Sequence, residues 1–195
     1  MTDAPVRYVS ADEDSARWVG FPFREGDIVR DTDAMNVFWI GISAQRDEEG
    51  APLPPLATVT PSGRIVDEII HRCREHRHTK LNAVDKVLVD ELGKLRNPTR
   101  KELEEGLRSI TNTMQQSTSA LFIFLGGLIR GHLSTRVLNR AFQEYVVYDL
   151  FETRTLFVQH PSYVRVYKYR NLEDYQSGVV RLIRQAARQG ARSSL

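Results

Sequence analysis

The sequence contains a single cysteine, little net charge and no long apolar run, and each of these absences excludes a class of protein. Cys73 cannot form an intramolecular disulfide, and alone it cannot hold a zinc ion or an iron–sulfur cluster. No stretch approaches the ~18 apolar residues of a membrane-spanning helix, and the polar, acidic amino-terminal segment is unlike a signal peptide. We therefore expect a cytoplasmic protein without a membrane partner.

A net charge of +2 over 195 residues excludes a chain that is basic throughout. The charge is unevenly distributed, because residues 1–50 carry 5 basic and 11 acidic side chains, whereas residues 130–195 carry 11 basic and 5 acidic ones. Any contact with a polyanion is therefore expected in the carboxyl-terminal third of the chain.

Apolar runs of strand length alternate with segments whose apolar residues recur at helical spacing. Strands are expected at residues 36–41, 81–89, 120–125 and 156–158. Helices are expected to follow Ser62, Thr99 (a capping box with Glu102), the pair Gly126 and Gly127, and Asn171. This alternation predicts an α/β fold, a three-layer α/β/α sandwich around a short four-stranded parallel sheet.

The length suits one domain, which we place at residues 34–190. Residues 1–33 are polar apart from a few apolar anchors, and they predict a leader packed on the domain. Residues 191–195 predict a tail. The segment 42–61 contains four prolines and a glycine, so an extended loop is expected there.

Residues 71–78 combine basic side chains with three histidines and the cysteine, namely His71, Cys73, His76 and His78. Their spacing is not that of a tetrahedral metal site, so no metal is expected. We expect this basic cluster to end the preceding helix and to face solvent.

The apolar residues 156–158 are followed directly by Gln159, His160, Pro161 and Ser162. This pattern predicts a buried parallel strand that ends at a functional edge of the sheet, with Pro161 holding His160 in place. Rings and cations then alternate, as suits a nucleic-acid surface, at Tyr163, Arg165, Tyr167, Lys168, Tyr169 and Arg170. A solvated basic loop, or an extended edge with the tyrosines on one face, is the alternative.

Three segments in this order resemble the uracil-DNA glycosylase superfamily, over residues 36–185. The first is the strand that ends at Gly41 with the loop 41–45 (GISAQ), followed by a helix entry at 62–67. The second comprises 81–84 (LNAV), 93–99 (GKLRNPT) with Glu102, and the strand at 122–127. The third is 160–162 (HPS). The resemblance implies a uracil-DNA glycosylase-like sandwich that hydrolyses the N-glycosidic bond of a flipped uracil, or of a related modified base, without a metal or organic cofactor.

The resemblance also implies roles for individual residues, with the target nucleotide turned out of the DNA into a pocket at the strand ends. His160 would donate a hydrogen bond to a base oxygen as negative charge develops there, and the carboxamide of Asn82 would read the base edge. The backbone at Gly41, Ile42 and Ser43 would contact the base. The DNA would be held by Ser162, the loop 163–166 with Tyr163 and Arg165, Lys168 and Arg170. A monomer is expected. Without the resemblance, Asn82 and His160 are also consistent with structural roles.

The sequence departs from the superfamily at the residue that positions or activates the attacking water. Many relatives carry Asp, Asn or Glu two residues after the first-motif glycine, whereas this chain has Ser43 there. A hydroxyl is a poor general base at its normal pKa. Ser43 itself, Gln45 and Asp47 are the nearest candidates for that role. The ring that relatives stack on the base is also missing from residues 51–61, which predicts a roomier pocket.

Three alternatives therefore stay open. A DNA-binding module of the same fold would hold damaged or single-stranded DNA without cleaving it. An α/β enzyme acting on free nucleosides would not need the basic segment 163–170. A glycosylase for modified bases in foreign DNA would explain the altered first motif.

Overall fold

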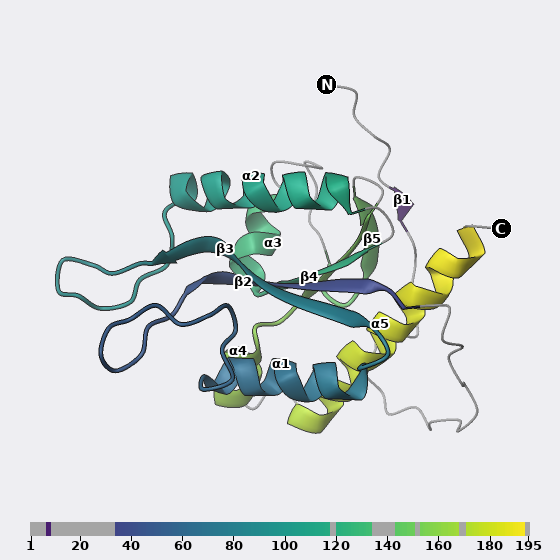
Figure 1. The fold of residues 1–195 in the computed structure, drawn as a ribbon, viewed down its shortest axis with the longest axis horizontal. Coiled ribbons are helices and arrows are strands. Elements are labelled where there is room, and N and C mark those ends of the chain that lie inside the picture. Colours follow the sequence, from purple (N-terminus) through teal and green to yellow (C-terminus); the bar gives the residue numbers. More distant parts are fainter. Residues whose placement is uncertain are drawn as a thin grey trace.

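In the computed structural model, six strands form one mixed sheet with helices on both faces (Figure 1). The structure describes residues 7–8, 34–117, 120–133, 143–150, 153–167 and 171–193. The strands are β1 (Arg7–Tyr8), β2 (Asn36–Ala44), β3 (Arg77–Val87), β4 (Leu121–Leu125), β5 (Val147–Leu150) and β6 (Thr153–Val158). The helices are α1 (Pro61–Arg72), α2 (Arg100–Gln116), α3 (Gly127–Leu133), α4 (Pro161–Tyr167) and α5 (Leu172–Ser193).

Four of the strands are parallel neighbours, in the order β3-β2-β4-β6. The central strand β4 (LFIFL) is buried at every position, as expected for a parallel strand covered on both faces. Beyond β6 the sheet continues with two antiparallel strands, β5 and then β1. The predicted sheet of four parallel strands is therefore incomplete, because the sheet is mixed. At four residues, β5 is too short to carry a clear period-two pattern.

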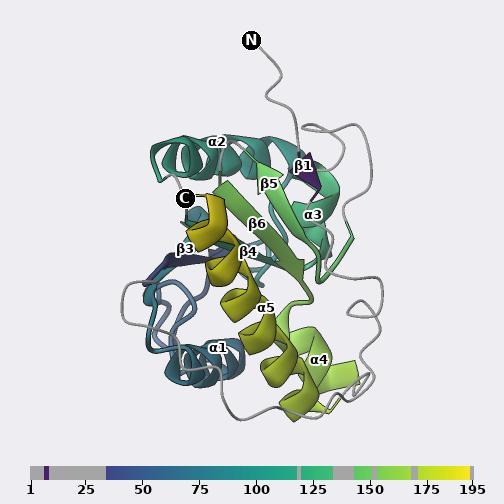
Figure 2. The same cartoon turned by 90° about the vertical axis from the view of Figure 1, so that its right-hand side faces the viewer.

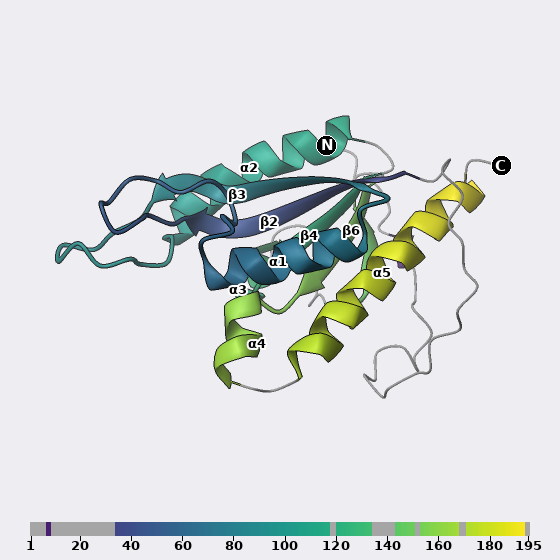
Figure 3. The same ribbon diagram turned by 60° about the horizontal axis from the view of Figure 1, so that its bottom comes forward.

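Helices α2 and α3 cover one face of the sheet, and α1, α4 and α5 cover the other (Figures 1 and 3). Two apolar clusters fill the two interfaces, one built around Phe122 and Phe124 and the other around Trp39, Ile123 and Tyr175. Figure 2 shows α5 crossing the sheet, with α1 and α4 beside its amino-terminal half. The predicted α/β architecture with helices on both faces is confirmed.

Local capping explains where two of the helices begin. Thr99 and Glu102 form the predicted capping box of α2, because each side chain accepts a hydrogen bond from the other residue's backbone amide. The cap predicted for α1 is wrong. Thr60 rather than Ser62 caps this helix, and Pro61 takes the first helical position, where its missing N–H is not needed.

The cluster at residues 71–78 ends the preceding helix, as predicted, since α1 stops at Arg72, but it does not face solvent throughout, because β3 already begins at Arg77. Cys73 and His76 are 0% and 5% exposed. Nδ1 of His78 accepts a hydrogen bond from the indole nitrogen of Trp39 at 3.1 Å, and its Nε2 lies 2.9 Å from the carbonyl oxygen of Cys73. The sequence pattern could not reveal this burial, because it depends on β2 lying beside β3.

The predicted leader at residues 1–33 is described only at residues 7–8, which form β1 at the edge of the sheet, and the remainder lies outside the described residues. Residues 191–193 of the predicted tail belong to α5, and residues 194–195 lie outside the described part. Among the described residues, no helix has the length and apolar character needed to cross a bilayer.

Candidate functional site

The carboxyl ends of the four parallel strands share one edge of the sheet, and the three motif segments meet there. Gly41 of β2 pairs with Asn82 of β3. Across β4, the amide of Gly126 donates to the carbonyl oxygen of Val158 at 2.8 Å, two residues before His160. Segments that are far apart in the sequence are therefore neighbours at this edge.

Asn82 occupies space that the missing side chain of Gly41 leaves open. A Cβ at position 41 would lie only 2.9 Å from Oδ1 of Asn82. Asn82 is 6% exposed, and no hydrogen bond to its carboxamide is found among the described residues. The oxygen and nitrogen of this carboxamide are also absent from the set of fully buried polar atoms that lack a hydrogen-bond partner. A buried asparagine in a structural role normally has such a partner, so this carboxamide is available to a ligand.

His160 lies between the end of β6 and the start of α4. Its Nδ1 lies 3.3 Å from the backbone nitrogen of Ser162 and 2.7 Å from the Ser162 hydroxyl oxygen. Because a backbone N–H can only donate, Nδ1 is the acceptor, and this network assigns the ring proton to Nε2. Burial lowers the pKa of His160 below its ordinary value, which favours the neutral ring. The result is a neutral imidazole with Nε2–H free to donate.

Gly126 follows β4, and its backbone conformation is the reason for a glycine at this position. A Cβ at position 126 would lie 3.5 Å from Cβ of His160 and 3.8 Å from Cδ1 of Ile42, and the φ of +99° at Gly126 is one that favours glycine. The sequence pattern assigned this residue only to a tight turn. The positive φ agrees with that turn, and the ordinary contact distances to His160 and Ile42 show that the ends of β2, β4 and β6 lie together here.

The segment after His160 is a helix rather than the loop that was predicted. Within α4, Val164 is buried, while Ser162, Tyr163 and Arg165 are exposed. The alternative of an extended edge with tyrosines on one face is therefore wrong for residues 163–167. Lys168, Tyr169 and Arg170 lie outside the described residues.

The candidates for water positioning lie in different surroundings. Ser43 is half-buried near the end of β2, next to an irregularity in the pairing with β3. Asp47 lies beyond the strand, in a hairpin closed by a bridge between Arg46 and Pro52. Its Oδ1 accepts from the amide of Ala51 at 2.7 Å, so its carboxylate helps to form this turn. The extended loop predicted at 42–61 is wrong at its start, because β2 continues to Ala44. Gln45 is exposed.

A hollow of about 480 Å³ lies beside α1; its lining includes none of the predicted site residues and consists of Thr58, Arg64, Asp67, Glu68, His71 and Arg72. Three of its charged side chains are already engaged, in contacts with Lys80, Gln176 and Glu173. Among the described residues, no group of three potential ligands could hold a metal ion. The strand ends therefore remain the better candidate site.

No protein-family model matches the chain, and no curated protein matches it.

Proposed function

We propose that this protein is a DNA glycosylase of the uracil-DNA glycosylase superfamily, which hydrolyses the N-glycosidic bond of a flipped uracil or of a related modified base. The observation that carries this proposal is the contact from the Ser162 amide to Nδ1 of His160, which leaves Nε2–H as the imidazole donor at the sheet edge that also holds Gly41 and Asn82. The convergence of the three motif segments on adjacent parallel strands supports it further.

In the proposed reaction the bond between C1′ of the sugar and the base nitrogen breaks, and its electron pair leaves with the base. The Nε2–H of His160 donates to a base oxygen on which the negative charge collects. Water adds to C1′ and loses a proton to solvent. A neutral donor suits this task, because it stabilises the leaving anion without first requiring a buried cation. One such donor is worth about 3 kcal/mol of transition-state stabilisation.

The contacts of Ser162 modify the role that the resemblance implies for it. Its hydroxyl lies 2.7 Å from Nδ1 of His160. A hydroxyl has a single proton, so it cannot donate to Nδ1 and to a phosphate oxygen at once. We therefore propose that Ser162 first sets the tautomer of His160. Phosphate contacts then fall to Arg165 on α4 and to Lys168 and Arg170.

One observation favours a second candidate, a DNA-binding module of the same fold that does not cleave. Position 43 carries a hydroxyl and position 44 a methyl group, so no carboxylate or amide stands at the position from which many relatives orient water, and Gln45, the one amide of this motif, is exposed. Residues 51–61 contain the half-buried Leu53 and Leu56 but no aromatic ring, which favours a pocket that admits a base larger than uracil.

Base release decides between these candidates. We would measure it on duplexes and single strands that carry uracil and a panel of modified bases, using the wild type, His160→Ala and His71→Ala. His71 is an exposed histidine on α1 and serves as the matched control. We expect His160→Ala to lower the rate by about 10²–10³-fold, as for loss of one donor to a developing anion, and His71→Ala to leave it unchanged. Binding of DNA without release of any base would favour the binding module.

A further inference from the structure

The turn between β6 and α4 is held through the carbonyl groups of three consecutive residues. The carbonyls of Val158 and His160 accept from backbone amides, at 2.8 and 2.9 Å. The carbonyl between them, that of Gln159, instead accepts from the side-chain hydroxyl of Tyr175 at 2.9 Å. The turn that presents His160 therefore depends on a side chain of α5.

Tyr175 is well placed to fix this turn. Its side chain is completely buried in the apolar cluster between the sheet and α1, α4 and α5. Burial raises the pKa of the Tyr175 hydroxyl well above its ordinary value, so the hydroxyl keeps its proton and can donate.

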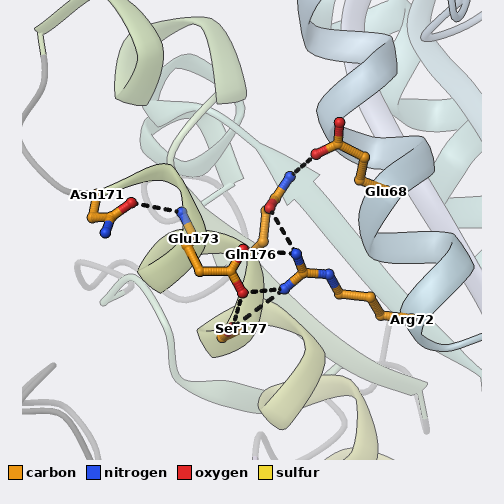
Figure 4. A network of polar contacts seen from close by, with 6 residues as sticks. All are labelled: Glu68, Arg72, Asn171, Glu173, Gln176 and Ser177. Atoms are coloured by element: carbon orange, nitrogen blue, oxygen red, sulfur yellow. Dashed lines mark hydrogen bonds and ion pairs between the residues drawn. The ribbon is translucent and has the colours of Figure 1, made fainter.

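The helix that carries Tyr175 is clamped to α1 (Figure 4). The guanidinium of Arg72 binds the carboxylate of Glu173 through two contacts, at 2.6 and 2.7 Å, and also reaches Oε1 of Gln176 at 3.3 Å. The amide of Gln176 in turn donates to Glu68. Because Glu173 and Gln176 precede and follow Tyr175 on the same turns of α5, the clamp fixes the rotation of the helix and the direction of the Tyr175 side chain.

We infer that Tyr175 is a positioning residue for His160. The bond to the Gln159 carbonyl fixes the peptide group that joins Gln159 to His160. It thereby keeps Nδ1 of the imidazole against Ser162 and the ring proton on Nε2. If the hydroxyl is lost, the partly buried Gln159 carbonyl loses its donor, and the turn is no longer tied to α5. The imidazole then loses its fixed contact with Ser162. The catalytic consequence rests on the proposed function, whereas the effect on the imidazole does not.

The test compares Tyr175→Phe with Tyr148→Phe. Each variant removes one hydroxyl from a buried ring; that of Tyr148 accepts from the amide of Gln143 at 2.8 Å, on the opposite face of the sheet. Imidazole ¹⁵N shifts, recorded above pH 7.5, report which nitrogen of His160 carries the proton. We expect the wild type and Tyr148→Phe to show one protonated and one unprotonated nitrogen. In Tyr175→Phe the two shifts should converge, as for an imidazole that exchanges between tautomers.

Identical His160 shifts in Tyr175→Phe and the wild type would overturn the inference, even if both variants had lost stability. If Tyr175→Phe does not fold, Glu173→Gln weakens the clamp and keeps the hydroxyl; convergence of the shifts would then support the inference, and unchanged shifts would overturn it.

A kinetic readout tests the link to catalysis. On uracil-containing DNA, Tyr175→Phe should lower kcat by about 10- to 100-fold with little change in KM, because a misplaced catalytic group costs rate more than binding. A wild type that releases no base would refute the proposed function alone, because the imidazole shifts would still decide the positioning role.

Discussion

Replacing Gly41 by alanine tests the geometry of the candidate site without any assumption about its substrate. The new Cβ would lie 2.9 Å from Oδ1 of Asn82 and at ordinary contact distance, 3.5 Å, from Leu56. The carboxamide is the end of a side chain and can rotate away, at a cost of about 0.5–1.5 kcal/mol for an unfavourable rotamer. Alanine also restricts the unfolded chain, which stabilises the protein by about 0.4–1 kcal/mol. The free energy of unfolding should therefore change by less than about 1 kcal/mol in either direction.

The origin of this small change can be isolated in a double-mutant cycle. In an Asn82→Ala background the close contact is absent, and only the effect of alanine on the unfolded chain remains. Gly41→Ala should therefore stabilise that background, and the coupling energy between the two positions should be about 0.5–1.5 kcal/mol. Urea unfolding of the four proteins measures this coupling. Equal effects of Gly41→Ala in both backgrounds would refute the contact between these two residues.

Gly106→Ala provides the contrasting case. A Cβ there would lie 1.8 Å from the backbone carbonyl oxygen of Ala83, which has no freedom to rotate. Helix α2 and strand β3 would have to separate, so this variant should lose about 1–3 kcal/mol or more. If Gly106→Ala lowered the free energy of unfolding as little as Gly41→Ala, the argument that a backbone neighbour is less able to move than a side-chain neighbour would be contradicted.

Two further predictions concern buried titratable groups. Burial lowers the pKa of His78, so the folded protein resists protonation of this imidazole. Stability that is present above about pH 6.5 should therefore be lost as the pH falls through the pKa of the folded state. The urea midpoints at pH 7.5 and 5.5 should differ less in His78→Gln than in the wild type, and an equal difference would exclude this contribution. Burial also raises the pKa of Cys73 to about 12, and its side chain is 0% exposed; a thiol reagent at pH 8 should react with it only as the protein unfolds, and immediate stoichiometric labelling of the native protein would contradict that burial.

Local signals in the sequence located most of the fold. The run LFIFL predicted β4 because a strand covered on both faces is apolar at every position. Thr99 and Glu102 marked the start of α2, and Asn171 that of α5, where its Oδ1 accepts from the amide of Glu173 at 3.1 Å. In each case the information lies within a few residues, which is why the prediction succeeded.

The failures have an equally local explanation. At α1 both Thr60 and Ser62 are good capping residues, and only the position of Pro61 between them favours the first. The same preference of proline for the first turn of a helix was available at Pro161, but the alternation of rings and cations after it suggested extended chain. A period-two pattern of exposed residues is weak evidence, because no buried face fixes the register.

The sequence predicted which residues belong to the candidate site better than it predicted how these residues contact one another. Parallel strands bring their carboxyl ends together, so Gly41 and His160 could be placed at one edge from the sequence. Asn82 was expected near the start of a strand at 81–89, and it lies beside Gly41 because β3 begins at Arg77 instead. The approach of Gly126 to His160 and the bond from Tyr175 to Gln159 could not be predicted, since both depend on how strands and helices pack. Tyr175 reads in the sequence as one apolar position of an amphipathic helix, and nothing there indicates its hydroxyl.

In the proposed reaction, the groups available to activate water are weaker than the donor available to the leaving base. Catalysis would therefore depend mainly on the turn between β6 and α4 that carries His160. On the water side, Ser43 offers a weakly basic hydroxyl, and the carboxylate of Asp47 is engaged with the amide of Ala51. On the leaving-group side, His160 presents a neutral donor whose orientation is set by Ser162 and, as we infer, by Tyr175. A site of this kind favours a reaction in which the bond to the base breaks early, because a sugar cation needs little help from a base to capture water. The rate then depends on how rigidly the donor is held, and so on the packing of α5 against the sheet and α1.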